Sequence, residues 1–163
     1  MSFARAAGLR TMIKAINVFT AEQPAGRHDV GSLAGSAETA MFMYDIAPGA
    51  SSSPYHYEYE EEWLLVVDGT VSVRTPDGEQ TLVRGDLARF PAGPAGAHKI
   101  SNRGDAPARA LVFSRTHAPA VSVYPDSNKL AVWPGGDGAD DLIVVRDHAV
   151  DWSHGEEGWE RAD

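Results

Sequence analysis

The chain has 163 residues, a mass of 17.5 kDa and a formal net charge of −9, which suits a single acidic domain. Hydrophobic residues make up 43% and charged residues 23%, as in folded globular proteins and unlike disordered chains. The absence of cysteine excludes disulfides, thiolate metal sites and a cysteine nucleophile. The acidic balance argues against nucleic acid or an anionic membrane as partner, because both would repel it.

The first dozen residues mix Ala, Arg and Gly and contain no apolar run long enough for a signal peptide or a membrane span. We therefore expect a cytoplasmic protein that begins with a frayed arm, with Met12 as an alternative natural start. Residues 20–39 are polar and rich in glycine, which favours irregular structure. Residues 1–39 are thus expected to form an N-terminal arm and connecting segment.

From residue 40 onward, short apolar runs alternate with turn signals such as Asp68 followed by Gly69. Asp and Gly tolerate the positive φ angles of tight hairpins. A spacing of about 8–12 residues between runs is typical of an antiparallel sandwich or barrel, so we predict an all-β fold. The predicted strands are residues 41–46, 63–67, 71–74, 80–83, 87–90, 98–101 and 108–114.

The strand signal weakens after residue 118, which ends the predicted barrel core at residues 40–118. Residues 121–124, 130–133 and 142–145 could form short strands, and an acidic, glycine-rich loop lies between the last two. We expect residues 119–163 to be a C-terminal extension that packs on the barrel and not a second domain.

The densest chemical signal lies in the segment 54–63, where His56 and Glu58 are two residues apart. In a strand, this spacing places both side chains on one face. Glu62 closes a run of three carboxylates, which repel one another unless solvent or a cation offsets their charge. His98 starts a distant strand. Imidazoles and carboxylates that converge inside a barrel suit divalent iron, manganese, nickel, zinc or copper, whereas the alternative interpretation is a solvated acidic loop.

The spacing of these residues resembles the two motifs of the cupin superfamily, and the similar region covers roughly residues 41–114. Within it, the chain is similar to small bacterial cupins of uncharacterised activity. The resemblance implies a double-stranded β-helix, the cupin jelly-roll barrel. The motif residues are Gly49, His56, Glu58, Glu62 and Gly69, followed by Gly85, Pro91, Gly93, His98 and Asn102.

The resemblance also implies a divalent metal ion held at the positions of His56, Glu58, Glu62 and His98. Glu58 stands where most cupins have a second histidine. Three alternatives follow: four ligands with a preference for harder ions such as Mn or Fe, three ligands with Glu58 as a general base, or no metal. Mn, Fe, Zn and Ni all stay open.

As a function, the resemblance implies an enzyme that acts on a small organic molecule by oxygenase or by isomerase or epimerase chemistry. Glu58 and Glu62 are the candidate catalytic residues, because a carboxylate beside a polarised oxygen can move a proton. The alternative is a non-catalytic module that binds or senses a small molecule, with or without metal.

The pattern also predicts which side chains share the barrel interior and which do not. Trp63 should face away from Glu62 and pack in the core. Arg89 is expected to be an exposed edge charge, and His28, His117, His148 and His154 are expected to be surface residues. A tyrosine stripe and open sheet edges favour a homodimer. If Glu62 and His98 point inward, so should their alternate neighbours Leu64, Val66, Ile100 and Asn102.

Overall fold

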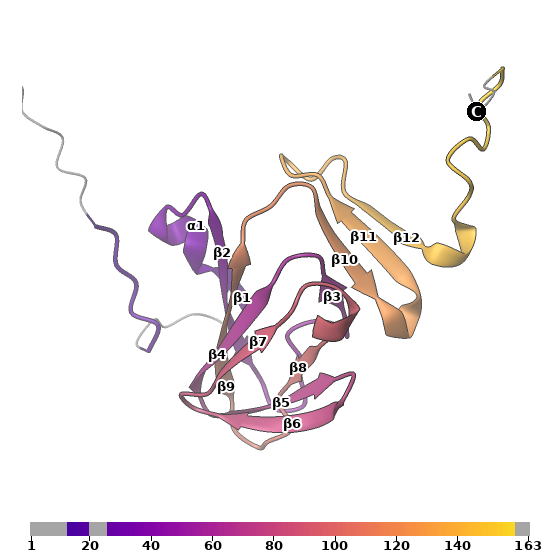
Figure 1. Ribbon diagram of the computed structural model, residues 1–163. Coiled ribbons are helices and arrows are strands. Elements are labelled where there is room, and N and C mark those ends of the chain that lie inside the picture. Colours follow the sequence, from indigo (N-terminus) through magenta and orange to yellow (C-terminus); the bar gives the residue numbers. More distant parts are fainter. Residues whose placement is uncertain (1–12, 20–25, 159–163) are drawn as a thin grey trace, which may run out of the picture.

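The computed structural model describes residues 13–19 and 26–158 and is built almost entirely from antiparallel strands (Figure 1). A five-stranded sheet has the order β1-β2-β9-β4-β7. It faces a three-stranded sheet with the order β6-β5-β8. The strands of the larger sheet are β1 Gly26–Asp29, β2 Thr39–Ile46, β4 Glu62–Asp68, β7 Leu87–Phe90 and β9 Ala108–Arg115; those of the smaller are β5 Thr70–Thr75, β6 Gly78–Val83 and β8 Lys99–Ser101.

The apolar core lies between these two sheets, as the alternating pattern predicts. Leu64, Val66 and Ile100 are at most 1% exposed and belong to one cluster of buried side chains. Asn102 is also buried, and its amide donates hydrogen bonds of 2.8 Å to the carbonyl oxygens of Ile46 and Ala106. The predicted jelly-roll interior is therefore confirmed, because the alternate residues of β4 and of the chain around β8 point inward together.

A third sheet, with the order β12-β11-β10-β3, is built from the C-terminal segment and from one strand that leaves the barrel (Figure 1). Its pairing of Tyr57 with Val123 and Glu58 with Ser122 joins the first motif to the C-terminal sheet. Its strands are β3 Tyr57–Glu58, β10 Ala120–Tyr124, β11 Lys129–Trp133 and β12 Leu142–Val145, and the short 3-10 helices η2 Pro125–Ser127 and η3 Arg146–His148 flank them.

The expectation of irregular structure across residues 20–39 is wrong for part of that segment. Residues 26–34 form β1 and a five-residue helix, α1 Val30–Ala34. Backbone pairing of β1 with β2 stabilises the strand, which presents no apolar periodicity of its own. Asp29 caps the helix by accepting a hydrogen bond from Ser32 N, and Gly35 ends it at φ 83°. The expected arm at residues 1–12 lies outside the described residues.

A second apolar cluster covers the outer face of the five-stranded sheet. Met43 and Leu111 are buried there beneath Val30 of α1, and Ile16 and Val18 pack against the same cluster. The segment that precedes the barrel therefore covers its outer surface. The described part of the chain has no helix long and apolar enough to cross a membrane.

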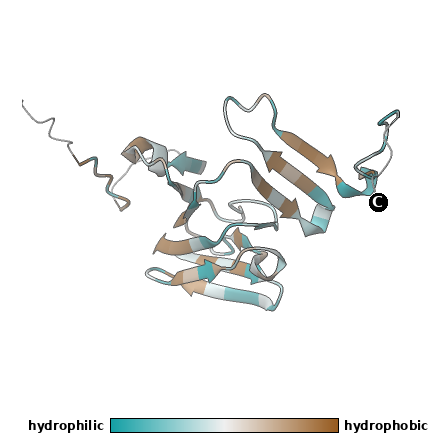
Figure 2. Ribbon diagram, turned by 45° about the horizontal axis from the view of Figure 1, so that its top comes forward, coloured by the Kyte–Doolittle hydropathy of each residue, from teal (hydrophilic) through white to brown (hydrophobic). Residues whose placement is uncertain are grey.

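The edge strand β12 exposes all four of its side chains, Leu142, Ile143, Val144 and Val145. Figure 2 shows the hydrophobic colouring of this strand at the outer side of the C-terminal sheet. An uncovered apolar edge is a site where sheets extend by association. The expected homodimer stays a prediction.

A glycine in the 3-10 helix η1 Pro94–Gly96 determines how closely the loop before β8 can approach the barrel. A Cβ atom on Gly96 would lie 1.7 Å from the carbonyl oxygen of Pro91. We expect Gly96→Ala to displace this loop, to reduce the free energy of unfolding by roughly 1–3 kcal/mol and to weaken zinc binding. Gly104→Ala is the matched control, since its Cβ would meet only Asn102 Oδ1, at 3.3 Å. Calorimetric unfolding and zinc titration of both variants check this, and equal behaviour of the two would contradict it.

Candidate metal centre

His56 and His98 are brought together by the backbone and not only by their side chains. His56 N donates to His98 O over 3.1 Å, and His98 N donates to His56 O over 2.8 Å. The two ring centroids lie 4.9 Å apart. This bridge fixes the relative position of two imidazoles that lie far apart in the sequence.

Both imidazoles are oriented by backbone carbonyls at the nitrogen that faces away from the centre. His56 Nδ1 lies 3.0 Å from Pro54 O, and His98 Nδ1 lies 2.9 Å from Gly96 O. A carbonyl oxygen only accepts, so each Nδ1 donates, and in the neutral ring Nε2 carries a free lone pair. The same arrangement orients histidine ligands in metal sites.

Glu62 places a carboxylate between the two Nε2 atoms from the first position of β4. Its Oε2 lies 3.9 Å from His56 Nε2 and 3.7 Å from His98 Nε2. Stacking on Phe90, with ring centroids 3.7 Å apart, holds the His98 ring in place. Among the described residues, these three side chains form the group whose potential metal-ligand atoms all lie within 4.8 Å of one another.

Burial makes this centre unfavourable for charge in the absence of a cation. Desolvation, with a contribution from the neighbouring Glu58, raises the pKa of Glu62 to about 8. Desolvation lowers the pKa of His98 to about 4 even though the Gly96 carbonyl favours its protonated form. At neutral pH the metal-free centre therefore contains a neutral His98 and a protonated Glu62.

The three side chains fit a divalent ion by their chemistry and spacing. Two ligands that each lie about 2.1 Å from one ion are about 3.0–3.5 Å apart, so the observed separations of 3.9 and 3.7 Å need to close by less than about 1 Å. Two imidazole lone pairs and one carboxylate form a donor set that suits first-row divalent ions. A bound ion would also replace the proton on Glu62.

Glu58 lies apart from this group, although sequence spacing placed it with His56. Its Oε1 accepts a hydrogen bond of 2.8 Å from Ser122 Oγ, because β3 pairs with β10 of the C-terminal sheet. Trp133 Nε1 donates to the same Ser122 Oγ over 3.3 Å. The structure thus brings three of the four candidate ligands together and directs the fourth to the wall of the adjoining cavity.

The three side chains open onto a cavity of about 650 Å³, which is large enough for a small organic molecule. Its walls come from the inner face of the large sheet and from β10 and β11. Lining residues from outside the metal centre include Arg27, Tyr44, Glu58, Arg115, Ser122, Tyr124 and Trp133.

A family model described as a cupin domain matches residues 42–114, which include all three side chains of the centre. A sugar phosphate isomerase of the cupin superfamily from Silicibacter pomeroyi is 29% identical, with a TM-score of 0.68 over 76% of this chain and 79% of that one. A solved structure from Acidithiobacillus ferrooxidans is 25% identical, with the same TM-score of 0.68 over 77% and 78%. The tetracenomycin polyketide synthase protein TcmJ of Streptomyces glaucescens is 29% identical over 63% of this chain and 71% of its own length.

The barrel has the cupin fold. Cupins commonly bind metal, and in this barrel His56, Glu62 and His98 are the residues placed to do so. Manganese, iron, zinc and nickel all accept this donor set.

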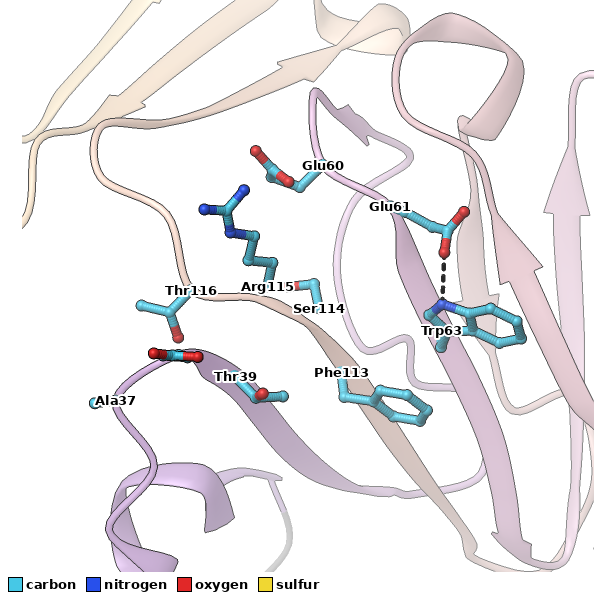
Figure 3. Close-up of a pocket in the computed structure, with 10 residues that line it drawn as sticks. Ala37, Thr39, Glu60, Glu61, Trp63, Phe113, Ser114, Arg115 and Thr116 are labelled. Carbon is cyan, nitrogen blue, oxygen red and sulfur yellow. Dashed lines mark hydrogen bonds between the residues drawn. The ribbon is translucent and has the colours of Figure 1, made fainter.

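A second cavity lies around Trp63 and Phe113, whose rings stack with centroids 6.4 Å apart (Figure 3). The indole Nε1 of Trp63 donates to Glu61, the bond drawn dashed in Figure 3. Trp63 faces away from Glu62, as its spacing predicts, but the expectation that it packs in the core is wrong, because it is half-buried and lines this cavity. None of the three candidate metal ligands lines this cavity in the described chain.

The remaining sequence candidates lie outside the group of three ligands, although His117 lines the metal cavity. Arg89 is half exposed on the edge strand β7 and pairs with Glu61 at 2.6 Å, as expected of an edge charge. His28 is half-buried on β1, and the others, His117, His148 and His154, are exposed. Sequence reasoning missed Arg27, because β1 was not predicted, and Ser122, because the pairing of β10 with β3 has no local sequence signal.

The raised pKa of Glu62 predicts that metal binding releases protons. Metal needs the carboxylate, but below pH 8 Glu62 holds a proton in the metal-free protein, so the affinity should rise by about tenfold per pH unit towards that value. Calorimetric zinc titration at pH 7 in two buffers of different ionisation enthalpy should show about one proton released per ion. Glu62→Gln should bind zinc more weakly and abolish the release. No proton release by the unmodified protein would contradict this account.

Proposed function

We propose that this cupin is a metal-dependent isomerase of a small phosphorylated sugar. The observation that carries the proposal is the cluster of His56, Glu62 and His98 at the base of a cavity large enough for such a molecule. The 29% identity to a sugar phosphate isomerase of the same superfamily supports the substrate class.

His56, Glu62 and His98 would hold the ion. When bound, a divalent ion supplies Lewis acidity that polarises a carbonyl or hydroxyl oxygen of the substrate. The walls of the cavity then orient the substrate carbons towards Glu58, and burial of the centre limits competition from water.

Glu58 is the candidate base, because it lines the same cavity without belonging to the group of three ligands. The hydrogen bond from Ser122 Oγ to Glu58 Oε1 orients the carboxylate. In an aldose–ketose isomerisation, Glu58 takes the proton from the carbon next to the carbonyl and returns it to the carbonyl carbon. The hydroxyl proton passes from one oxygen to the other, so Glu58 ends as it began and no co-reactant is consumed.

The same ligand set favours a second candidate, an oxygenase reaction. Two histidines and one carboxylate on one face are the ligands of non-haem iron(II) oxygenases. Consumption of oxygen by the iron(II)-loaded protein with a small organic substrate, in the absence of isomerase activity, would favour this candidate. Binding of a small molecule without either reaction would favour the alternative that the protein is a non-catalytic binding module.

Replacing Glu58 tests the proposed base directly. We expect Glu58→Gln to keep the metal content unchanged and to slow deuterium incorporation from heavy water into a sugar phosphate by about 10²–10⁴-fold, because the amide cannot take the proton. Proton NMR of a panel of three- to six-carbon sugar phosphates follows the exchange at each carbon.

Glu61→Gln is the matched control, since Glu61 is a neighbouring carboxylate that pairs with Arg89 outside the metal cavity. It should exchange deuterium at the rate of the unmodified protein. Loss of metal from Glu58→Gln would show that Glu58 is a ligand, and exchange at an undiminished rate would reject its role as base.

A further inference from the structure

Arg27 projects from the edge strand β1 onto the inner face of the five-stranded sheet. β1 pairs with β2 so that Arg27 lies opposite Tyr44. Directly opposed residues of an antiparallel pair share a face, and Tyr44 packs against the barrel core. Arg27 is accordingly part of the wall of the metal cavity, together with Phe42 and Tyr44.

The guanidinium of Arg27 is held in place by aromatic residues and not by a carboxylate. Its Cζ lies 3.7 Å from the centroid of the Phe42 ring, and Tyr44 is its direct cross-strand neighbour. Asp29, the acidic residue nearest in sequence, is occupied in capping α1 through hydrogen bonds from Ser32 N and Oγ.

Two other arginines of this sheet, Arg109 and Arg89, differ from Arg27 in this respect. Arg109 makes a bidentate ion pair with Asp45, and Arg89 forms an ion pair with Glu61. Within residues 13–19 and 26–158, no carboxylate forms an ion pair with Arg27 within 4.0 Å. A stacked guanidinium without such a partner has N–H donors available for an anionic ligand. It can donate two hydrogen bonds to two oxygens of a planar carboxylate or a tetrahedral phosphate group.

We propose that Arg27 binds the anionic group, phosphate or carboxylate, of the molecule that this cavity takes. Phe42 on β2 pairs with Val112 of β9, which pairs with Leu64 of β4, two residues along the strand from Glu62. Two strand spacings of ~4.8 Å and two residues of ~3.4 Å along the strand place the anion subsite and the metal centre about 12 Å apart. The ligand is therefore an elongated small molecule with an anion at one end and oxygen donors at the other. That the other end of the ligand carries oxygen donors for the metal rests on the proposed function. The anion subsite at Arg27 does not depend on the metal.

The test compares glycerol 3-phosphate, glycerate and glycerol, which differ in the anionic group, by titration against the metal-free and the zinc-loaded protein. The unmodified protein should bind one of the two anions more tightly than glycerol in both forms, and the better anion identifies the group. Arg27→Gln should weaken that binding by about 10–100-fold while zinc affinity stays unchanged, because a charge-assisted pair is lost. Arg27→Lys should give an intermediate loss, since it keeps the charge without the planar fork.

Arg84→Gln is the matched control for net charge, because Arg84 also lies over an aromatic ring, that of Phe19, but does not line the metal cavity. It should bind the anion as the unmodified protein does. Equal anion binding by Arg27→Gln and the unmodified protein, equal losses in Arg27→Gln and Arg84→Gln, or no preference for either anion over glycerol would overturn the proposal. If the protein fails to bind zinc but still binds the anion in a way that depends on Arg27, the proposed function is rejected and the anion subsite is supported.

Discussion

Two backbone hydrogen bonds between His56 and His98 are the constraint on which the candidate site depends. They join two segments 42 residues apart in sequence and direct both imidazoles towards Glu62 of β4. Because both partners in each bond are backbone groups, the bridge survives many side-chain changes nearby. The carbonyls of Pro54 and Gly96 then orient each ring, so the site is organised by the main chain before any ion binds.

The burial that organises the centre also determines its chemistry. A carboxylate excluded from water is costly unless an opposite charge offsets it. In the metal-free protein, the raised pKa of Glu62 keeps its carboxyl group protonated, so no negative charge is buried. A divalent ion would stabilise the ionised carboxylate and would also bind the lone pairs of His56 and His98. The positive charge of the ion would lie at the base of the cavity, and Arg27 and Glu58 both line the wall of the same cavity. Such a distribution suits an anionic ligand with oxygen donors.

Local signals in the sequence predicted most of the barrel, because each strand is closed by a turn residue and buries alternate side chains. The convergence of His56, Glu62 and His98 followed from the two motifs. The position of Glu58 did not, because its spacing from His56 indicates a shared face but does not reveal that β3 pairs with Ser122 of β10. β1 escaped prediction because pairing with β2 stabilises it without an apolar pattern, and Arg27 was missed with it.

One divalent ion is expected to bind among His56, Glu62 and His98. Anomalous diffraction from crystals grown with zinc tests this, because the signal locates the metal without reference to any assumed chemistry. We expect one strong peak roughly 2.0–2.2 Å from His56 Nε2, His98 Nε2 and a Glu62 carboxylate oxygen. A zinc-bound crystal whose anomalous peaks all lie elsewhere, with these three side chains unliganded, would contradict it.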